Sequence, residues 1–312
     1  MSINIPAWFA RQYATNVSLK LQIMGSMLRP YVTEGSYVGE AAQVVDQIGS
    51  IEMQPVTQRF APMGRVDAPL DSRWVFPQDW DLPQLFDKFD KLRLIVDEES
   101  PSVQNAVLAA GRQMDRIILR AFTADAKTGV NGGTTTSVVG GNEVDVAVGG
   151  ANSKLNVAKL LEVKRLMRAN YVNLESEQVY AILTAADEAS LLQEIQIISS
   201  EFNGMDKPVL QDGRVTRFLG INFIYCELAE TILAGTNEVN VPVWVKSGMH
   251  LGIWNDVTTS TSVRNDLQGE PFQAYLKLTA GATRIEENKV YNIESYRAYS
   301  SNDQEVESWQ LI

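Results

Sequence analysis

The residues that most often carry enzyme chemistry are scarce in this chain. Its 312 residues include one histidine, His250, and one cysteine, Cys226. Zinc sites built from several His and Cys ligands are therefore excluded. His250 lies between apolar residues and no G-x-S-x-G nucleophile motif occurs in the chain, so we interpret it as a structural histidine. Cys226 ends an apolar run that starts at Ile221, which is typical of a buried core residue.

Other groups that could bind a ligand have simpler interpretations. Acidic residues cluster at 79–81, 97–99 and 286–287, but none of these segments fits the twelve-residue calcium loop. Glycine-rich phosphate loops are absent from the sequence. Tryptophans could form a platform for sugars or bases, but contacts in the core and between subunits are more typical of Trp74, Trp80, Trp244, Trp254 and Trp309. We therefore predict no catalytic residue, no cofactor and no metal.

Composition and charge narrow the class of protein further. Hydrophobic residues make up 45% and charged residues 21% of the chain, as in soluble folded proteins. There are 27 basic and 38 acidic residues, a net charge of −11, which disfavours binding that depends on neutralising nucleic-acid phosphates. No apolar stretch is long enough for a membrane span, and the start lacks a basic segment followed by an apolar one. We expect no membrane partner and a cytosol-like compartment.

Two long elements and one α/β region are expected to make up most of the fold. A helix is predicted from Pro101 to about Ala124, with Ser100 as its N-cap. Strict alternation from Phe272 to Thr283 predicts an unusually long strand. Between them, residues 128–250 alternate helices and strands, including a helix that Thr184 and Asp187 would begin with a capping box. A long strand beside a long helix indicates an elongated subunit.

The segment from Val44 to Trp80 differs from these elements in its predicted secondary structure. Short strand-like pieces, Ser50 to Phe60 and Arg73 to Phe76, predict a two-stranded excursion that needs a partner surface to be stable. We interpret the excursion as a strap that contacts a neighbouring subunit, with a solvated hairpin as the simpler alternative. Its candidate interface residues are mixed in charge, with one aromatic anchor: Arg59, Arg65, Asp67, Asp71, Arg73 and Trp74.

Several segments together resemble a known family. These segments are Val38 to Glu40, Asp46 to Gly49, Asp67 to Pro69, Arg73, Asp90 to Arg93, Asn105, Gly111 to Asp115 and Gly281 to Glu287. They resemble the major capsid proteins of tailed bacteriophages over about residues 38–295. The motifs are structural and less specific than a catalytic signature.

The resemblance implies an α+β fold of the HK97-like type. Its parts would be an N-terminal arm at 1–40, an E-loop hairpin at 41–88, a peripheral domain whose spine helix lies in 89–127, an α/β axial domain at 128–250, and the long strands and tail of the peripheral domain at 251–312. It also implies hexameric and pentameric capsomers that self-assemble into an icosahedral head in the bacterial host cytoplasm. The implied partners are portal and head-completion proteins, a separate scaffold or cement protein, and packaged double-stranded DNA bound without sequence specificity.

Two departures from the family and two alternatives remain at this point. The chain lacks a long, charged, helical N-terminal extension that could serve as a built-in scaffold, so we expect a separate scaffold, or none. In some shells of this fold an E-loop lysine forms a covalent cross-link, but residues 46–87 contain no lysine. We therefore expect a noncovalent shell. An encapsulin-like compartment that encloses cargo enzymes would share the fold. A hydrolase or carbohydrate-binding module would instead use His250 or the tryptophans.

Overall fold

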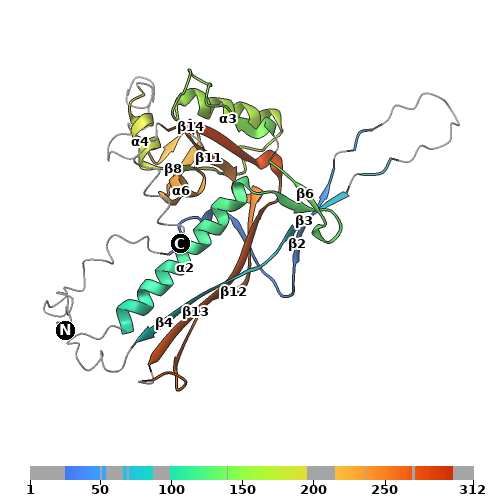
Figure 1. Cartoon of the computed structure of the whole chain (residues 1–312). Helices are drawn as coiled ribbons and strands as arrows, with labels where there is room; N and C mark the ends of the chain where they lie inside the picture. The colour runs from blue at the N-terminus through green and yellow to red at the C-terminus, as the bar shows by residue number, and fades with distance from the viewer. Residues whose placement is uncertain are drawn as a thin grey trace.

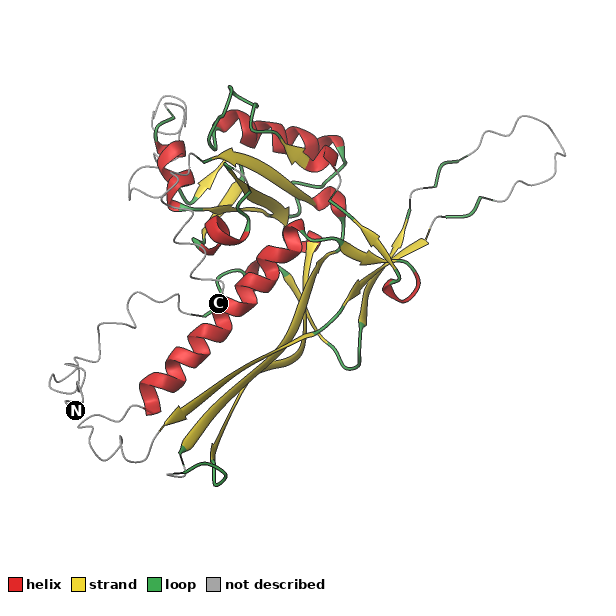
Figure 2. Cartoon of the chain, viewed as in Figure 1, coloured by secondary structure: helices red, strands yellow, loops and turns green. Residues whose placement is uncertain are grey.

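The structure is a computed structural model that describes residues 25–49, 51–53, 66–68, 70–86, 99–138, 140–194, 215–235, 237–268 and 271–297. The elements of this part of the chain form three sheets around one long helix, and the subunit is elongated, with a ribbon that extends away from the body (Figures 1 and 2). No helix among the described residues is long and apolar enough to cross a membrane.

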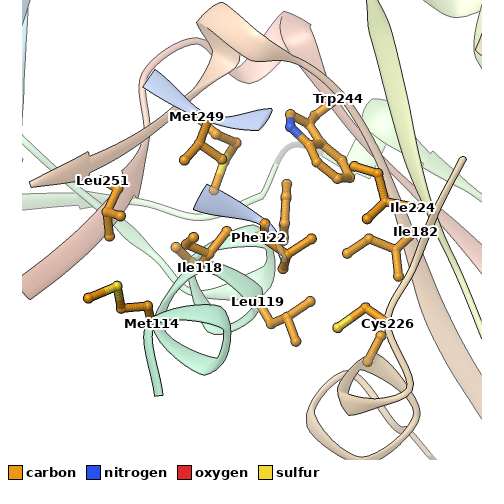
Figure 3. Packing of buried hydrophobic residues seen from close by; sticks show 14 of the residues in the cluster. Met114, Ile118, Leu119, Phe122, Ile182, Ile224, Cys226, Trp244, Met249 and Leu251 are labelled. Carbon is orange, nitrogen blue, oxygen red and sulfur yellow. The ribbon is translucent and has the colours of Figure 1, made fainter. Parts of the chain in front are cut away.

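The long helix is α2, Glu99–Thr123, which at 1.5 Å per residue is about 37 Å long. The predicted helix is confirmed, but it begins two residues earlier than Pro101, so Ser100 lies inside it and is not the N-cap. One face of α2 carries Met114, Ile118, Leu119 and Phe122 into the main core (Figure 3). A fully buried side chain of this size contributes roughly 1.5–3 kcal/mol, so this face fixes the helix on the sheets.

A four-stranded sheet of long strands lies beside α2. Its order is β1 (Thr33–Ser36), β12 (Met249–Val263), β13 (Phe272–Arg284) and β4 (Gln78–Phe86). The long alternating strand is confirmed, because β13 spans the whole predicted segment. Strand β4 pairs with β13 along its length, so the second part of the predicted E-loop segment is an edge strand of this sheet.

Between β3 and β4 the chain passes very close to strand β13. A Cβ atom at Gly281 would lie 2.3 Å from the Phe76 carbonyl oxygen, a distance that side chains do not tolerate. Glycine at this position of β13 therefore lets the chain pass from β3 to β4 directly over the strand.

The α/β region is built on a six-stranded mixed sheet. Its order is β7 (Glu143–Val144), β14 (Val290–Tyr296), β11 (Glu238–Val245), β8 (Val179–Leu183), β10 (Ile221–Tyr225) and β9 (Arg217–Phe218). Strand β14 belongs to this sheet although it lies beyond the 128–250 segment in the chain, because it pairs with β11 and β7.

In the described part of the chain, this sheet is accompanied by α3 (Val157–Ala169), α4 (Ala185–Leu192) and α6 (Leu228–Ile232). The predicted capping box of α4 is confirmed, since the Thr184 side chain accepts a hydrogen bond from the Asp187 N–H. Helix α3 has Asn156 as its N-cap, whose side chain accepts a hydrogen bond from the Lys159 N–H. Leu160, Val163 and Met167 of α3 pack on the sheet in a second core.

The third sheet forms the base of the extended ribbon. Its order is β2 (Ala42–Ile48), β3 (Leu70–Val75), β5 (Ala126–Thr128) and β6 (Thr134–Thr136). The strand expected from Ser50 to Phe60 is not found where that segment is described, because 51–53 are not in a strand; 54–60 lie outside the described residues. Instead, the strand that pairs with β3 lies a few residues earlier, in β2.

Candidate subunit interface

The ribbon of β2 and β3 has two different faces. Antiparallel pairing places Gln47 opposite Asp71, and Val45 opposite Arg73, on one face. This face is turned to the body, where the Gln47 side chain donates a hydrogen bond to the Ile285 carbonyl oxygen and Arg73 is buried. The opposite face is turned to solvent.

Apolar side chains lie on the solvent face. Ile48 is directly opposite Leu70, and the two side chains are 69% and 75% exposed. Ile51 and Met53 continue the chain beyond β2, and their side chains are exposed as well. An outward strand face is normally polar when it stays in water, so apolar side chains in this position indicate a surface that another chain covers.

The structure places three of the six predicted interface residues in contacts within their own chain. The Gly129 N–H donates to Asp71 Oδ1 at 3.1 Å, and Trp74 Nε1 donates to the Gly129 carbonyl oxygen at 2.8 Å. Both contacts hold the ribbon against the loop after β5. Arg73 Nη2 lies 3.5 Å from Glu287 Oε1, and both side chains are largely shielded from water.

Of the other three predicted residues, Asp67 is exposed, and Arg59 and Arg65 lie outside the described residues. The role of all six residues between subunits stays a prediction. The structure adds that Asp71, Arg73 and Trp74 fix the base of the ribbon within the subunit.

The sequence did not indicate the role of Arg284, which fixes the base of the ribbon to the body of the subunit. Arg284, at the end of β13, is 1% exposed and donates hydrogen bonds to the carbonyl oxygens of Ala121, Phe122 and Ala124, at the C-terminal end of α2. Its Nε also donates to Glu287 Oε2 at 3.0 Å. Glu287 therefore connects Arg284 with Arg73, and so links the long helix with the ribbon. The sequence signal was the segment Gly281 to Glu287, which resembles the capsid family but gave no role for its charged residues.

The N-terminal segment is fixed on the long helix by a buried carboxylate. Asp115 of α2 is 0% exposed and accepts hydrogen bonds from the Ser26 hydroxyl and from the N–H groups of Met27 and Leu28, at 2.6–3.0 Å. Burial raises the pKa of Asp115, which these hydrogen bonds partly counteract. Gly111 permits the close approach, because a Cβ atom there would lie 2.4 Å from the Gly25 backbone.

The candidate catalytic groups have structural roles. His250 is buried; its Nδ1 is 2.9 Å from Thr33 Oγ1 and its Nε2 is 2.9 Å from Tyr37 Oη. Burial lowers the pKa of His250 to about 4 and raises the pKa of the Cys226 thiol to about 11. Neither group is therefore prepared for acid–base or nucleophilic chemistry near neutral pH. Among the described residues, no group of three or more His, Cys, Asp or Glu side chains could hold a metal ion.

The tryptophans that the structure describes lie in different places. Trp74 is at the ribbon base, Trp254 is beside the Tyr37 ring, and Trp244 is buried in the main core with its Nε1 donating to the Tyr31 carbonyl oxygen. Trp309 lies outside the described residues. The preferred interpretation of Trp244 as a core residue is confirmed.

The fold is that of HK97-like phage capsid subunits. The chain is similar to the capsid of cyanophage P-SCSP1u, with a TM-score of 0.68, 13% identity and 93% of each chain covered. It is also similar to the cyanophage Pam1 capsid asymmetric unit, with a TM-score of 0.71, 13% identity, and coverage of 93% of this chain and 97% of that one. The capsid of Ralstonia phage GP4 gives a TM-score of 0.67 at 10% identity, over 93% of this chain and 96% of that chain.

The sequence identifies the family within this fold. The model of the phage capsid protein family matches residues 5–296, and the chain belongs to that family. No curated protein sequence matches the chain. Family and fold together give the function of a major capsid protein of a phage, which forms homo-oligomeric capsomers in the virion capsid. A capsid family and fold imply a structural protein, and the encapsulin, hydrolase and carbohydrate-binding alternatives are not favoured.

Proposed function

We propose that this chain assembles as hexamers and pentamers into the icosahedral head of a tailed phage, which encloses a double-stranded DNA genome. The parts of the subunit would be the arm at 1–40, the E-loop at 41–88, the spine helix region at 89–127, the axial domain at 128–250 and the long strands and tail at 251–312. Strand β4 would act with the long strands, and β14 would act with the axial domain, because of their pairing in the sheets.

The single observation that carries this proposal is the apolar pair Ile48 and Leu70, which is exposed on the solvent face of the ribbon next to the polar pair Asp46 and Ser72. Full burial would stabilise each of these two side chains by roughly 1.5–3 kcal/mol, and the described residues leave both exposed. Many identical contacts of this kind, repeated around a closed symmetric assembly, would hold a shell together.

The remaining partners follow from the same proposal. The head would be assembled in the host cytoplasm with portal and head-completion proteins and with a separate scaffold or cement protein. The net charge of −11 supports a shell that encloses DNA without binding it tightly.

Expression of the whole chain without other phage proteins, and again with a candidate scaffold, tests this assembly. We expect rings of five and six or closed shells in negative-stain electron microscopy. Replacement of both ribbon residues, Ile48→Ser with Leu70→Ser, is expected to leave a folded monomer that no longer forms closed shells.

Val38→Ser is the matched control, because Val38 is an exposed apolar residue outside the ribbon. It should assemble as the unaltered chain does. A chain that remains a 34.6 kDa species at every concentration, even with scaffold, would overturn the proposal.

A further inference from the structure

The two outer edges of the six-stranded sheet carry opposite charge. Strand β7 forms one edge and β9 the other. At the β7 edge the carboxylates of Glu143, Asp145, Glu238 and Glu294 lie close enough that their charges act on one another: burial first, and then the three neighbouring carboxylates, raise the pKa of Glu238. We call these four residues the acidic edge.

A cation beside the acidic edge is turned inward. Lys159 is 0% exposed, and its Nζ donates to the carbonyl oxygens of Ser153 and Glu294 at 2.7 and 2.6 Å. Glu143 and Asp145 are exposed. The acidic edge therefore presents net negative charge to solvent, a surface that a cationic partner would fit.

At the β9 side of the same sheet the charge is positive. Lys164 of α3 donates from Nζ to the Leu219 carbonyl oxygen at 2.8 Å, which joins α3 to the turn between β9 and β10. Arg168 follows Lys164 by one helical turn and is exposed, as is Arg217 of β9. Arg165 is also exposed, but it is paired with Glu162 at 2.6 Å. We call Lys164, Arg165, Arg168 and Arg217 the basic edge.

An aromatic side chain stands at the end of α3, beside the basic edge in the chain. Tyr171 is 96% exposed and has a φ of 59°, a left-handed conformation that favours glycine. Its N–H donates to the Arg168 carbonyl oxygen and the Val172 N–H donates to that of Met167, as in a helix end that usually has glycine at this position. A tyrosine held outward on a rigid turn suits a protein contact, and Leu161 of α3, 49% exposed, adds apolar area.

The edges are suited to side-chain contacts more than to strand pairing. Strands β7 and β9 each have two residues, so neither offers a ladder of backbone groups to another strand. Opposite charges on opposite edges of one molecule are complementary in a head-to-tail arrangement of identical copies. Such a contact closes into a ring when its rotation allows.

We propose that the acidic edge of one copy docks against the basic edge, with Tyr171, of the next copy around each capsomer ring. The partner is a second copy of this chain, and the inference rests on the proposed assembly into five- and six-membered rings. The charges set the order and direction of the copies, and the apolar side chains add contact area.

Charge reversal at each edge tests the docking. One variant combines Glu143→Lys, Asp145→Lys and Glu238→Lys, so three of the four carboxylates become cations and both of its edges are basic. The other combines Arg165→Glu, Arg168→Glu and Arg217→Glu, so three of the four cations become carboxylates and both of its edges are acidic. Each alone should remain a folded monomer and form at least ~tenfold fewer rings than the unaltered chain, because like charges then meet. A chain with all six substitutions should form rings again.

Mixing the two variants gives a sharper result. Copies with two basic edges can alternate with copies with two acidic edges, and alternation closes only in rings with an even number of members. An equal mixture should therefore form hexamers but not pentamers in electron microscopy, whereas the six-substitution chain should form both.

The controls are charge reversals near the central strands of the same sheet, Glu175→Lys before β8 and Lys246→Glu after β11, which should assemble normally. Circular dichroism and thermal unfolding would show that each variant is folded. Normal assembly of the single-edge variants, or no recovery in a folded six-substitution chain, would overturn the edge docking alone. An unaltered chain that never assembles would overturn the proposed function and this inference together.

Discussion

His250 shows how one buried side chain makes stability depend on pH. Its pKa is about 4 in the folded chain and 6.5 in an unfolded one. Between these values the unfolded chain binds more protons, so the free energy of unfolding falls as the pH is lowered. We expect a loss of about 2 kcal/mol from this residue between roughly pH 7 and pH 5.

The measurement is urea unfolding of the soluble subunit at the two pH values, for the unaltered chain and for His250→Gln. The amide can still donate and accept a hydrogen bond between Thr33 and Tyr37 but does not titrate. The variant should therefore be less sensitive to pH. Because the chain has a single histidine, its imidazole proton signal in NMR should also keep the neutral position down to about pH 5; equal pH sensitivity of both chains would contradict the argument.

At the scale of elements, Arg284 joins the long helix, the long strand and the ribbon. Its guanidinium binds three carbonyl oxygens at the end of α2 and the carboxylate of Glu287. Arg284→Met would leave these acceptors buried and unpaired, with a cost of about 3 kcal/mol in the free energy of unfolding. Urea unfolding of the subunit measures this loss.

An exposed arginine serves as the control that distinguishes the loss of a buried arginine from the loss of an ordinary surface ion pair. Arg264 is paired with Asp266 at 2.6 Å, but both side chains are exposed. Arg264→Met should therefore leave the unfolding midpoint nearly unchanged, because water replaces the lost contact. Similar midpoints for the two variants would show that the buried position of Arg284 has no special importance.

The elements with a clear period were predictable from sequence, and those that depend on distant pairing were not. The helix α2 and the strand β13 follow from apolar spacing within each segment, and α4 follows from the Thr184 capping box. Nothing local indicates that β4 leaves the E-loop segment for the long sheet, or that β14 joins β11, because register is set by the partner strand.

At the candidate interface, too, some features were predictable from the local sequence and others depended on strand pairing. The excursion was predicted from its composition, but the face of each side chain depends on the pairing of β2 with β3, and the expected strand was placed several residues too late. As a result Ile48 and Leu70, on the exposed face, were missed, while Arg73, on the inner face, was selected. A shift of one residue in a strand moves a side chain to the opposite face, so charge alone could not separate the two.

At the scale of the whole molecule, the absence of lysine from residues 46–87 bears on how the proposed shell is held together. An amide cross-link from the ribbon needs a lysine amine, and this segment of the chain has none. In the proposed shell, contacts of the kind that Ile48 and Leu70 would make take the place of that cross-link. Assembled heads boiled in SDS should give one band near 34.6 kDa.

Denaturant distinguishes the two kinds of shell in solution. Guanidinium weakens apolar burial and screens charge, so a noncovalent shell should dissociate into subunits and lose its light scattering completely. Cross-linked rings would survive the same treatment as species five and six times the subunit mass. A ladder of such bands would place a covalent bond outside the ribbon, and the ribbon contacts would then no longer be the main source of the strength of the shell.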